Sequence, residues 1–257
     1  MILYANGCSF TWGGNLYNFS NGINGEIWLP RDKDHPMNSE RQNVVYPAHL
    51  GKLLGADKVI NDSLGCGSNH RIVRTTLDYF VGLLNNNQEV SDHFVTIQWT
   101  EPSRIEFFDE IDDTWHMITA KSSVCETDPA KCNISNELRE IYYKRIYSDI
   151  QSAEIFMSHI ICLGSFFEKH KIPYLFFCSI NFWSEGTHLL KSALPKIDKI
   201  MSDYNWYNDI PSQSFMAGKV DAPHGAHPSL LGHIQWAEKL FLEIDRQKLI
   251  YVKREVL

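Results

Sequence analysis

The 257-residue chain has no dense run of lysine or arginine, and its 24 basic residues are outnumbered by 31 acidic ones, giving a net charge of −7. Proteins that bind the phosphate backbone of DNA or RNA concentrate lysine and arginine on one face. The charge balance therefore argues against nucleic acid as a partner. The 44% of hydrophobic residues argues against a disordered chain.

The N-terminal segment MILYANGCSF has no basic stretch and turns polar at Asn6, so it lacks the pattern of a signal peptide. The most apolar stretch, residues 156–167, is interrupted by Ser158, His159 and Gly164 and is shorter than a membrane-spanning helix requires. We therefore expect a cytoplasmic protein without a membrane partner.

Six cysteines are scattered along the chain without a C-x-x-C pair, and without an export signal we expect them to be reduced. No internal repeat or low-complexity segment divides the sequence. At 257 residues the chain is long enough to bury one large core. The expected organisation is a single α/β domain over residues 1–257.

Short apolar runs alternate with longer amphipathic segments. The runs expected as strands are residues 2–5, 58–61, 93–99 and 173–180, and the segments expected as helices are 44–54, 68–84, 136–171, 186–203 and 229–246. Strands that alternate with helices predict a parallel sheet covered by helices on both faces. Residues 13–43 and 103–135 show little periodicity and are expected to be irregular insertions, the second with an acidic cluster at 109–113.

A serine stands directly after the first expected strand, in the segment GCSFTWG of residues 7–13. Catalytic groups gather at the carboxyl ends of parallel strands, so this turn would present the Ser9 hydroxyl to a crevice. If a helix begins there, its backbone N–H groups also face a developing negative charge. The other interpretation is that Ser9 only caps that helix, a common role of serine at a strand–helix junction.

A histidine-rich segment, HGAHPSLLGH at residues 224–233, precedes an apolar helix near the other end of the chain. A histidine in a loop before a helix cap, here Ser229, is well placed to be a general base because its pKa lies near neutrality. The three histidines also suggest zinc, but their loop spacing differs from the i, i+4 spacing of metalloprotease helices. His233 lies inside the helix and is expected to be structural.

Together the two segments resemble the GDSL, or SGNH, hydrolase family. Residues 7–13 are similar to its nucleophile block, with Cys8 where the family commonly has aspartate, and residues 227–233 are similar to its histidine block. The resemblance implies a three-layer α/β/α, flavodoxin-like fold with a central parallel sheet of about five strands. It also implies that Ser9 is the nucleophile and that a late Asp-x-x-His carries the base.

The resemblance leaves two histidines as candidates for the base. His227 is preferred because the Pro-Ser-x-x-Gly context follows it, yet His224 stands three residues earlier, where the family has aspartate. Asp221 stands three residues before His224, so residues 221–224 themselves form an Asp-x-x-His. We therefore expect His227 as base, His224 as the alternative, and either Asp221 or a backbone carbonyl as the group that orients the ring.

The middle blocks of the family pattern imply the oxyanion hole. Residues 61–69 are similar to the second block, and its glycine position falls on Cys66, where a backbone N–H survives the substitution. The third block corresponds to residues 98–101, where the usual asparagine is missing and Thr100 would supply a hydroxyl instead. The expected oxyanion donors are the backbone of Ser9, Cys66 and Gly67 and the side chain of Thr100.

The expected function is that of a serine esterase or acyl hydrolase, with no metal and no organic cofactor. Its substrate would be a small-molecule or carbohydrate ester, for example an O-acyl group on a sugar. The carbohydrate interpretation depends on Trp12, Trp99 and Trp183, which would stack on sugar rings. The alternative is that these tryptophans belong to the core.

A rival interpretation is a catalytically weak or inactive protein that keeps the hydrolase fold for binding or structure. The altered third block and the displaced aspartate favour it. The segment QWTEPSR at 98–104, with the turn GCGSN at 65–69, is similar to an SGNH-like subgroup common in phage genomes. An oligomeric or virion partner, and a virion-associated location, would then be expected.

Overall fold

The structure is a computed structural model of the whole chain. It describes residues 1–14, 16, 41–111, 113–120, 123–125, 132–179, 199–200, 202–207 and 227–250.

A parallel sheet forms the centre of the protein, as the alternating pattern predicts. Its described strands lie in the order β2-β1-β3-β7. They are β1 (Ile2–Asn6), β2 (Lys58–Asn61), β3 (His93–Trp99) and β7 (Tyr174–Cys178). Trp206 adds a parallel bridge to Phe176 at the outer edge of β7. The described part of the sheet thus has four strands and this bridge, where about five strands were expected.

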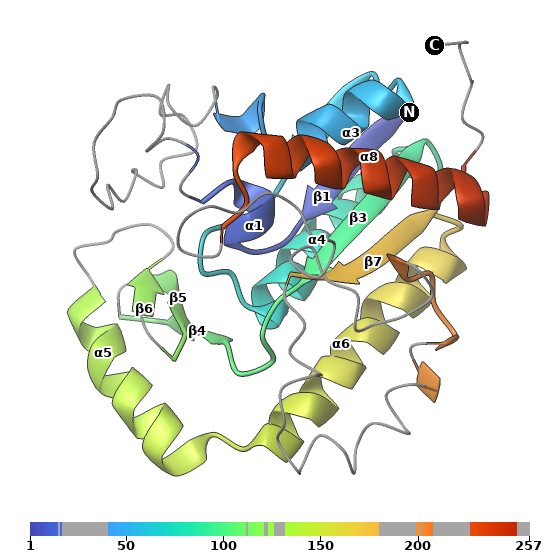
Figure 1. Cartoon of the computed structure of the whole chain (residues 1–257). Helices are drawn as coiled ribbons and strands as arrows, with labels where there is room; N and C mark the ends of the chain where they lie inside the picture. The colour runs from blue at the N-terminus through green and yellow to red at the C-terminus, as the bar shows by residue number, and fades with distance from the viewer. Residues whose placement is uncertain are drawn as a thin grey trace.

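Helices cover both faces of this sheet (Figure 1). On one face α4 (Asn69–Asn85) packs against α6 (Asp149–Lys169), and on the other α3 (Tyr46–Leu54) packs against α8 (Leu230–Gln247). Between these layers the sheet separates two clusters of buried side chains. The chain thus has the expected three-layer α/β/α fold.

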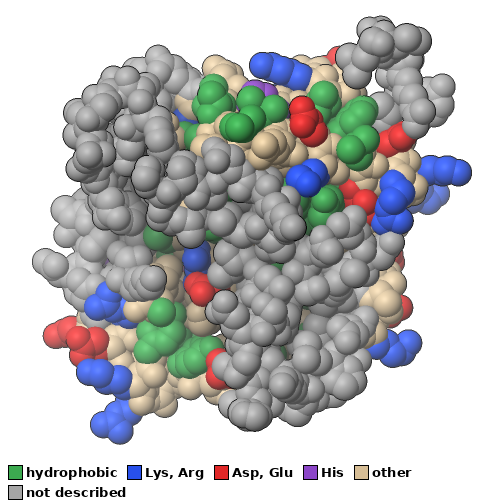
Figure 2. Space-filling view, viewed as in Figure 1, with side chains coloured by type: hydrophobic (Ala, Val, Ile, Leu, Met, Phe, Trp, Pro, Cys, Tyr) green, Lys and Arg blue, Asp and Glu red, His purple; other side chains and the backbone are tan. Residues whose placement is uncertain are grey.

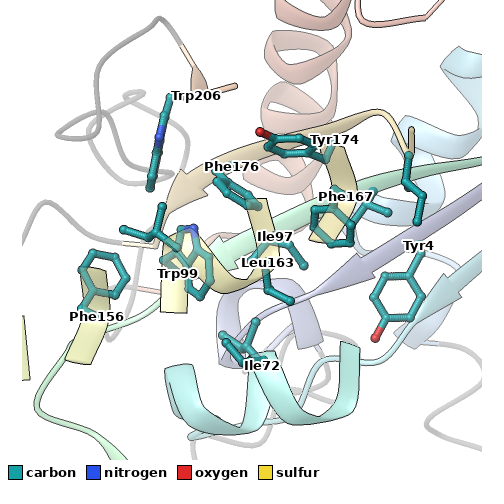
Figure 3. Close-up of a cluster of buried hydrophobic side chains, with 14 of the residues drawn as sticks. Tyr4, Ile72, Ile97, Trp99, Phe156, Leu163, Phe167, Tyr174, Phe176 and Trp206 are labelled. Atoms are coloured by element: carbon teal, nitrogen blue, oxygen red, sulfur yellow. The ribbon is translucent and has the colours of Figure 1, made fainter. Parts of the chain in front are cut away.

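The central strand β3 contributes buried side chains to both clusters. All seven of its residues are buried, as expected for a strand covered on both faces. Ile97 and Trp99 point to the cluster under α4 and α6, where Trp99 packs edge-on against Phe156 and Phe176 (Figure 3). Phe94 belongs to the opposite cluster, under α3 and α8.

The segment 103–135 is not an irregular insertion, and that expectation is wrong. It contains β4 (Ile105–Asp109), β5 (Thr114–Ile118) and β6 (Ser123–Cys125), which form an antiparallel sheet. The acidic cluster forms the turn between β4 and β5, where Asp109 Oδ1 accepts the N–H of Ile111 at 2.8 Å and Asp113 has a φ of +50°. Such short strands leave little periodicity to detect.

Two helical segments follow this second sheet, α5 (Cys132–Ile141) and the π-helix η3 (Tyr142–Ile146). Figure 1 shows the second sheet and α5 beyond the carboxyl ends of β1 and β3. An ion pair between Arg74 of α4 and Glu106 of β4, with Nε 2.9 Å from Oε1, attaches the second sheet to the main layers. The second sheet therefore stands beside the edge where parallel α/β folds place their sites.

The apolar stretch expected to be too short to span a membrane belongs to α6, which has 21 residues. By length and composition alone, α6 is the one helix in the described part of the chain that would be able to cross a membrane, with a mean hydropathy of 1.3 over the apolar window. Its buried residues, among them Phe156, Ile160 and Leu163, lie in the core cluster. This burial is typical of a core helix.

Hydrophobic side chains also lie on the outer surface of α8, where Leu230, Leu231 and Leu242 are exposed (Figure 2). The inner face of the same helix carries His233, which is fully buried. Its Nδ1 accepts the backbone N–H of Tyr46 at 3.1 Å. Burial, with the charges of His49 and His227, lowers the pKa of His233 to about 3. His233 thus has the structural role expected of it.

The depressed pKa of His233 predicts a loss of stability in acid. In the unfolded chain His233 binds a proton near pH 6.5, whereas in the folded chain it does so only near pH 3. The unfolding free energy therefore falls as the pH falls from about 6.5 to about 3. His233→Asn keeps an acceptor for Tyr46 but does not titrate. We expect its unfolding free energy, measured by urea denaturation between pH 7.5 and 4.5, to fall less steeply than that of the wild type, by up to about 1.4 kcal/mol per pH unit.

His159, whose pKa burial also lowers to about 3, and His49 and His70, whose pKa values burial also lowers, remain in both proteins and contribute to the residual slope. Because asparagine is smaller, the variant is expected to be less stable at every pH, and the slope is the quantity that decides. Equal slopes in the two proteins would show that His233 is already neutral in the unfolded chain or charged in the folded one.

Candidate functional site

The candidate nucleophile lies in a tight turn between β1 and α1 (Ser9–Trp12). Cys8, not Ser9, is the N-cap of α1, and no side-chain hydrogen bond caps the helix. Gly13 closes the helix in the left-handed conformation, with a φ of +82°. Ser9 is therefore the first helical residue, and the interpretation that its hydroxyl only caps the helix does not hold.

Ser9 and His227 meet, although 218 positions separate them in the sequence. Ser9 Oγ and His227 Nε2 are 2.9 Å apart. The ring of Phe10 stacks on the imidazole, with 5.0 Å between the ring centroids. When the imidazole is neutral with its proton on Nδ1, Nε2 accepts a hydrogen bond from the Ser9 hydroxyl. This is the arrangement of a nucleophile and its base.

The N-terminus of α8 holds His227 in place. Ser229 is the N-cap, and its Oγ accepts the N–H of Gly232 at 3.0 Å, while its carbonyl accepts the N–H of His233 at 2.9 Å. His227 therefore lies two residues before a capped helix. Because α8 packs on α3 and its buried face lies in the cluster under the sheet, the histidine loop is anchored to the same sheet as Ser9.

Gln98, next to the last residue of β3, is fully buried and binds the residues of α1 and its N-cap. Its Oε1 accepts hydrogen bonds from Thr11 N at 3.2 Å, from Thr11 Oγ1 at 2.8 Å and from Cys8 Sγ at 3.5 Å. A Cβ on Gly7 would lie 2.3 Å from Thr11 Oγ1 and 2.9 Å from Gln98 Cβ, so only glycine fits there. Sequence reasoning missed this role of Gln98, whose signal is a polar residue inside an apolar strand.

Two asparagines at strand ends connect the nucleophile turn to its neighbours. Asn6 is fully buried; its Oδ1 accepts the N–H of Gly7 at 2.8 Å, and its Nδ2 donates to Thr75 Oγ1 at 2.8 Å. At the end of β2, Asn61 Nδ2 donates to the carbonyl of Thr11 at 3.1 Å. The start and the end of α1 are thus fixed from the two sides.

The turn that contains Cys66 packs directly on the nucleophile turn. Leu64 N donates to the carbonyl of Gly7 at 3.3 Å, and a Cβ on Gly67 would lie 3.2 Å from that same carbonyl oxygen. Cys66 has a φ of +64°, in the left-handed region that favours glycine. The backbone at Cys66 is therefore the one that a glycine would adopt.

Two of the expected oxyanion donors are not available as expected. The N–H of Gly67 donates to the carbonyl of Leu64 at 3.0 Å, so the turn itself uses it. Thr100 is fully buried, and its hydroxyl has no hydrogen-bond partner within the described residues. A donor must reach the surface to touch a substrate, so this arrangement does not support Thr100 as a donor. Ser9 and Cys66 remain the candidates for backbone donors.

Other expected residues fall in the core or outside the described part of the chain. Asp221, His224 and Trp183 lie outside the described residues. Trp99 is fully buried, so it belongs to the core and offers no surface to a sugar. One face of the Trp12 ring is covered by the guanidinium of Arg41, at 3.4 Å from the ring centroid.

A cavity of about 790 Å³ lies beside the edge strand β2. Its walls include Trp12, Arg41, Asn61 and Asp62, but neither Ser9 nor His227 lines it. Of the residues of α1, only Trp12 lines this cavity, and the cavity is therefore not formed by the Ser9–His227 pair.

A family model matches most of the chain. A family model described as a "Family of unknown function (DUF6071)" matches residues 27–254. No protein with a curated description matches the sequence.

Solved structures match almost the whole chain at low identity. The crystal structure of TesA is 11% identical, with 97% of this chain and 100% of that chain covered and a TM-score of 0.50. A carbohydrate esterase family 2 enzyme with its carbohydrate-binding domain, from Corynascus thermopiles (Myceliophthora fergusii), is 13% identical, with 95% and 65% covered and a TM-score of 0.51. A GDSL-like lipase from Bacteroides thetaiotaomicron is 9% identical, with 96% and 88% covered and a TM-score of 0.44. At such identities the likeness to the first two structures establishes the fold alone.

The contact between Gly14 and His227 leads to a prediction. A Cβ at residue 14 would lie 2.9 Å from Cδ2 and 3.1 Å from Nε2 of His227, and 3.3 Å from Ser9 Cβ. In Gly14→Ala the imidazole or the backbone at residue 14 must therefore shift, which alters the geometry between Ser9 and His227. We expect kcat/KM for an ester substrate to fall about 10–100-fold, because a displacement of about 1 Å costs a factor of this size. Gly82→Ala, where nothing lies within 4 Å of the new Cβ, is the matched control. Wild-type turnover in Gly14→Ala would show that the position of His227 does not matter.

A second prediction concerns the left-handed backbone of Cys66. That conformation costs an L-residue about 1–2 kcal/mol. Glycine avoids this strain, but it loses more conformational entropy on folding, which offsets part of the gain. Cys66→Gly should therefore raise the unfolding free energy by up to about 1 kcal/mol and keep any esterase activity, since the N–H remains. Cys162→Gly, in the middle of α6, should lower it by about 0.3 kcal/mol, because glycine is a weaker helix former than cysteine. Urea denaturation measures the change in unfolding free energy of each variant relative to the wild type. A change of the same sign in both variants would contradict the strain at Cys66.

Proposed function

This chain belongs to the DUF6071 family, whose description assigns no function, and we propose that it is a serine hydrolase of ester bonds. The observation that carries the proposal is the 2.9 Å distance between Ser9 Oγ and His227 Nε2. A serine that only stabilises a fold has no need of an imidazole aimed at its hydroxyl. The turn after the first strand of a parallel sheet is also the place where such a pair meets substrate.

The proposed reaction proceeds through an acyl-enzyme. Ser9 Oγ attacks the ester carbonyl carbon while His227 Nε2 takes the hydroxyl proton. The tetrahedral intermediate collapses, the C–O bond to the alcohol breaks, and His227 returns the proton to the departing alkoxide. Water then attacks the acyl-Ser9 ester with His227 again as base, which releases the acid and restores the serine.

The oxyanion would be held by the backbone N–H groups of Ser9 and Cys66. With Gly67 used in its turn and Thr100 buried, the hole has fewer donors than the family pattern implies. The loss of one donor costs about 10²–10³ in rate, so slow turnover is expected. Asp221, or a backbone carbonyl, remains the proposed group that orients the His227 ring.

The substrate is proposed to be a small-molecule or carbohydrate ester. One of the matched solved structures is a carbohydrate esterase by title, which supports ester cleavage in general. The tryptophans expected to stack on sugars give no support to a carbohydrate, since Trp99 is in the core and Arg41 covers a face of Trp12.

The proposal predicts that Ser9 is reactive. The wild type should hydrolyse 4-nitrophenyl acetate and accept a fluorophosphonate probe at one serine, and Ser9→Ala should lose the label and at least about 100-fold in rate. Ser158→Ala removes an exposed hydroxyl of α6 and serves as the control. Unfolding curves of the three proteins show whether Ser9→Ala keeps the fold.

An unlabelled wild type that hydrolyses the ester no faster than Ser9→Ala would overturn the proposal. The rival interpretation, a binding or structural protein that uses the hydrolase fold without its chemistry, would then take its place.

A further inference from the structure

The turn after β3 lies at the edge of the sheet where Ser9 also lies. β3 pairs with β1 as far as Asn6 and Ile97 and ends at Trp99, and the chain continues through Thr100 into the turn. Arg104 N donates to the carbonyl of Glu101 at 3.1 Å, and Tyr143 Oη donates to the carbonyl of Ser103 at 3.0 Å. The turn at 101–104 is therefore fixed by its own backbone and by η3.

Asn69 connects this turn to the nucleophile turn. Its Oδ1 accepts the N–H of Thr100 and its Nδ2 donates to the Thr100 carbonyl, both at 2.9 Å. Two residues before it, Gly67 packs on the backbone of Gly7 and Cys8. The three turns thus form one braced unit, with Arg104 at the end of the third.

Arg104 carries a charge that its surroundings only partly neutralise. Its side chain is 16% exposed, and its Nε donates to Glu101 Oε2 at 3.3 Å, while that carboxylate is itself 39% exposed. The two terminal nitrogens of the guanidinium have no hydrogen-bond partner within the described residues. Burial lowers the pKa of Arg104, but Cys8, Glu101 and Cys66 raise it more, so the net shift is upward. The turn that ends at Arg104 is joined through Asn69 to the turn that packs on Gly7 and Cys8, so Arg104 lies at the same edge of the sheet as the Ser9 turn.

The neighbouring Arg74 shows what a structural arginine looks like in this protein. Its Nε and Nη2 bind both oxygens of Glu106, at 2.9 and 3.0 Å, and its guanidinium lies 4.1 Å from the centre of the Trp115 ring. The guanidinium nitrogens of Arg74 are therefore bonded to a carboxylate of the protein, and its guanidinium plane is covered by a tryptophan of the protein. Arg104 uses only Nε, and its open fork matches the geometry of a carboxylate or a phosphate.

We propose that Arg104 binds an acidic group of the substrate, so that the preferred substrates are esters with a carboxylate or phosphate close to the scissile bond. This inference rests on the proposed hydrolase function and narrows its substrate class. A mostly buried guanidinium with one exposed partner gains most when a substrate anion completes its hydrogen bonds. Arg104 is then a specificity residue for the same site.

Matched substrate pairs test the proposal and locate the acid. Mono-4-nitrophenyl glutarate and its methyl ester place or remove a carboxylate on the acyl side, and 3-acetoxybenzoate and its methyl ester do so on the alcohol side. The wild type is expected to favour the acidic member of one pair by about 10-fold or more in kcat/KM, as a charge-assisted bidentate contact allows. Arg104→Gln should abolish that preference, with a loss in kcat/KM that is about 10-fold or more larger on the acidic member than on the neutral member. Arg104→Lys should keep part of it, and Arg145→Gln, which removes an exposed charge from η3, should keep all of it.

Two results would overturn the proposal: no acid preference in either pair, or an equal loss on acidic and neutral esters in Arg104→Gln. Binding of glutarate to the Ser9→Ala protein, followed by calorimetry with and without Arg104→Gln, separates this inference from the hydrolase function. Arg104-dependent binding would support the acid site even if Ser9 proved unreactive. Binding that does not depend on Arg104 would contradict it even if Ser9 proved catalytic.

Discussion

The hydrogen bond between Ser9 and His227 depends on both residues being attached to one parallel sheet. β1 delivers Ser9 at its carboxyl end, and α8, packed on α3 over the face of that sheet, delivers His227 from the loop before its N-cap. Ser9 is the first residue of α1, directly after β1, and His227 lies two residues before the N-cap of α8, so fixed elements hold the two side chains 2.9 Å apart. The proposed chemistry follows from this anchoring, because a base acts on a nucleophile only at hydrogen-bond distance.

Close backbone packing around Ser9 sets the shape of the site. At Gly7, Gly14 and Gly67 a Cβ would meet another atom at 2.3, 2.9 and 3.0 Å, so each position excludes a side chain. The turns can then approach until their backbones touch, which brings N–H groups near the place where an oxyanion would form. Cys66 fits into this crowded region only by adopting the left-handed backbone of a glycine.

Most polar groups at and just after the end of β3 use their hydrogen bonds to hold the site in place. One of them, Arg104, has donors that no described residue binds. Gln98 uses its oxygen on α1, and the backbone of Thr100 is fully engaged by Asn69. Arg104 has one carboxylate on one nitrogen. Because a buried charge is costly unless it is paired, the part of this guanidinium that no described residue binds is the group that we propose receives the substrate anion.

The sequence by itself determined the layers and the segments of the site. The runs of buried residues in β1, β3 and β7, the stop at Gly55 and the cap at Ser229 are local patterns, and the structure confirms them. The antiparallel sheet β4-β5-β6 escaped prediction because its strands are short and partly exposed. Only the tertiary structure decided that the Ser9 hydroxyl meets His227, that a turn uses the Gly67 N–H, and that Thr100 and Trp99 are buried. These facts depend on contacts between residues far apart in the chain, and no local periodicity encodes a distance across the fold.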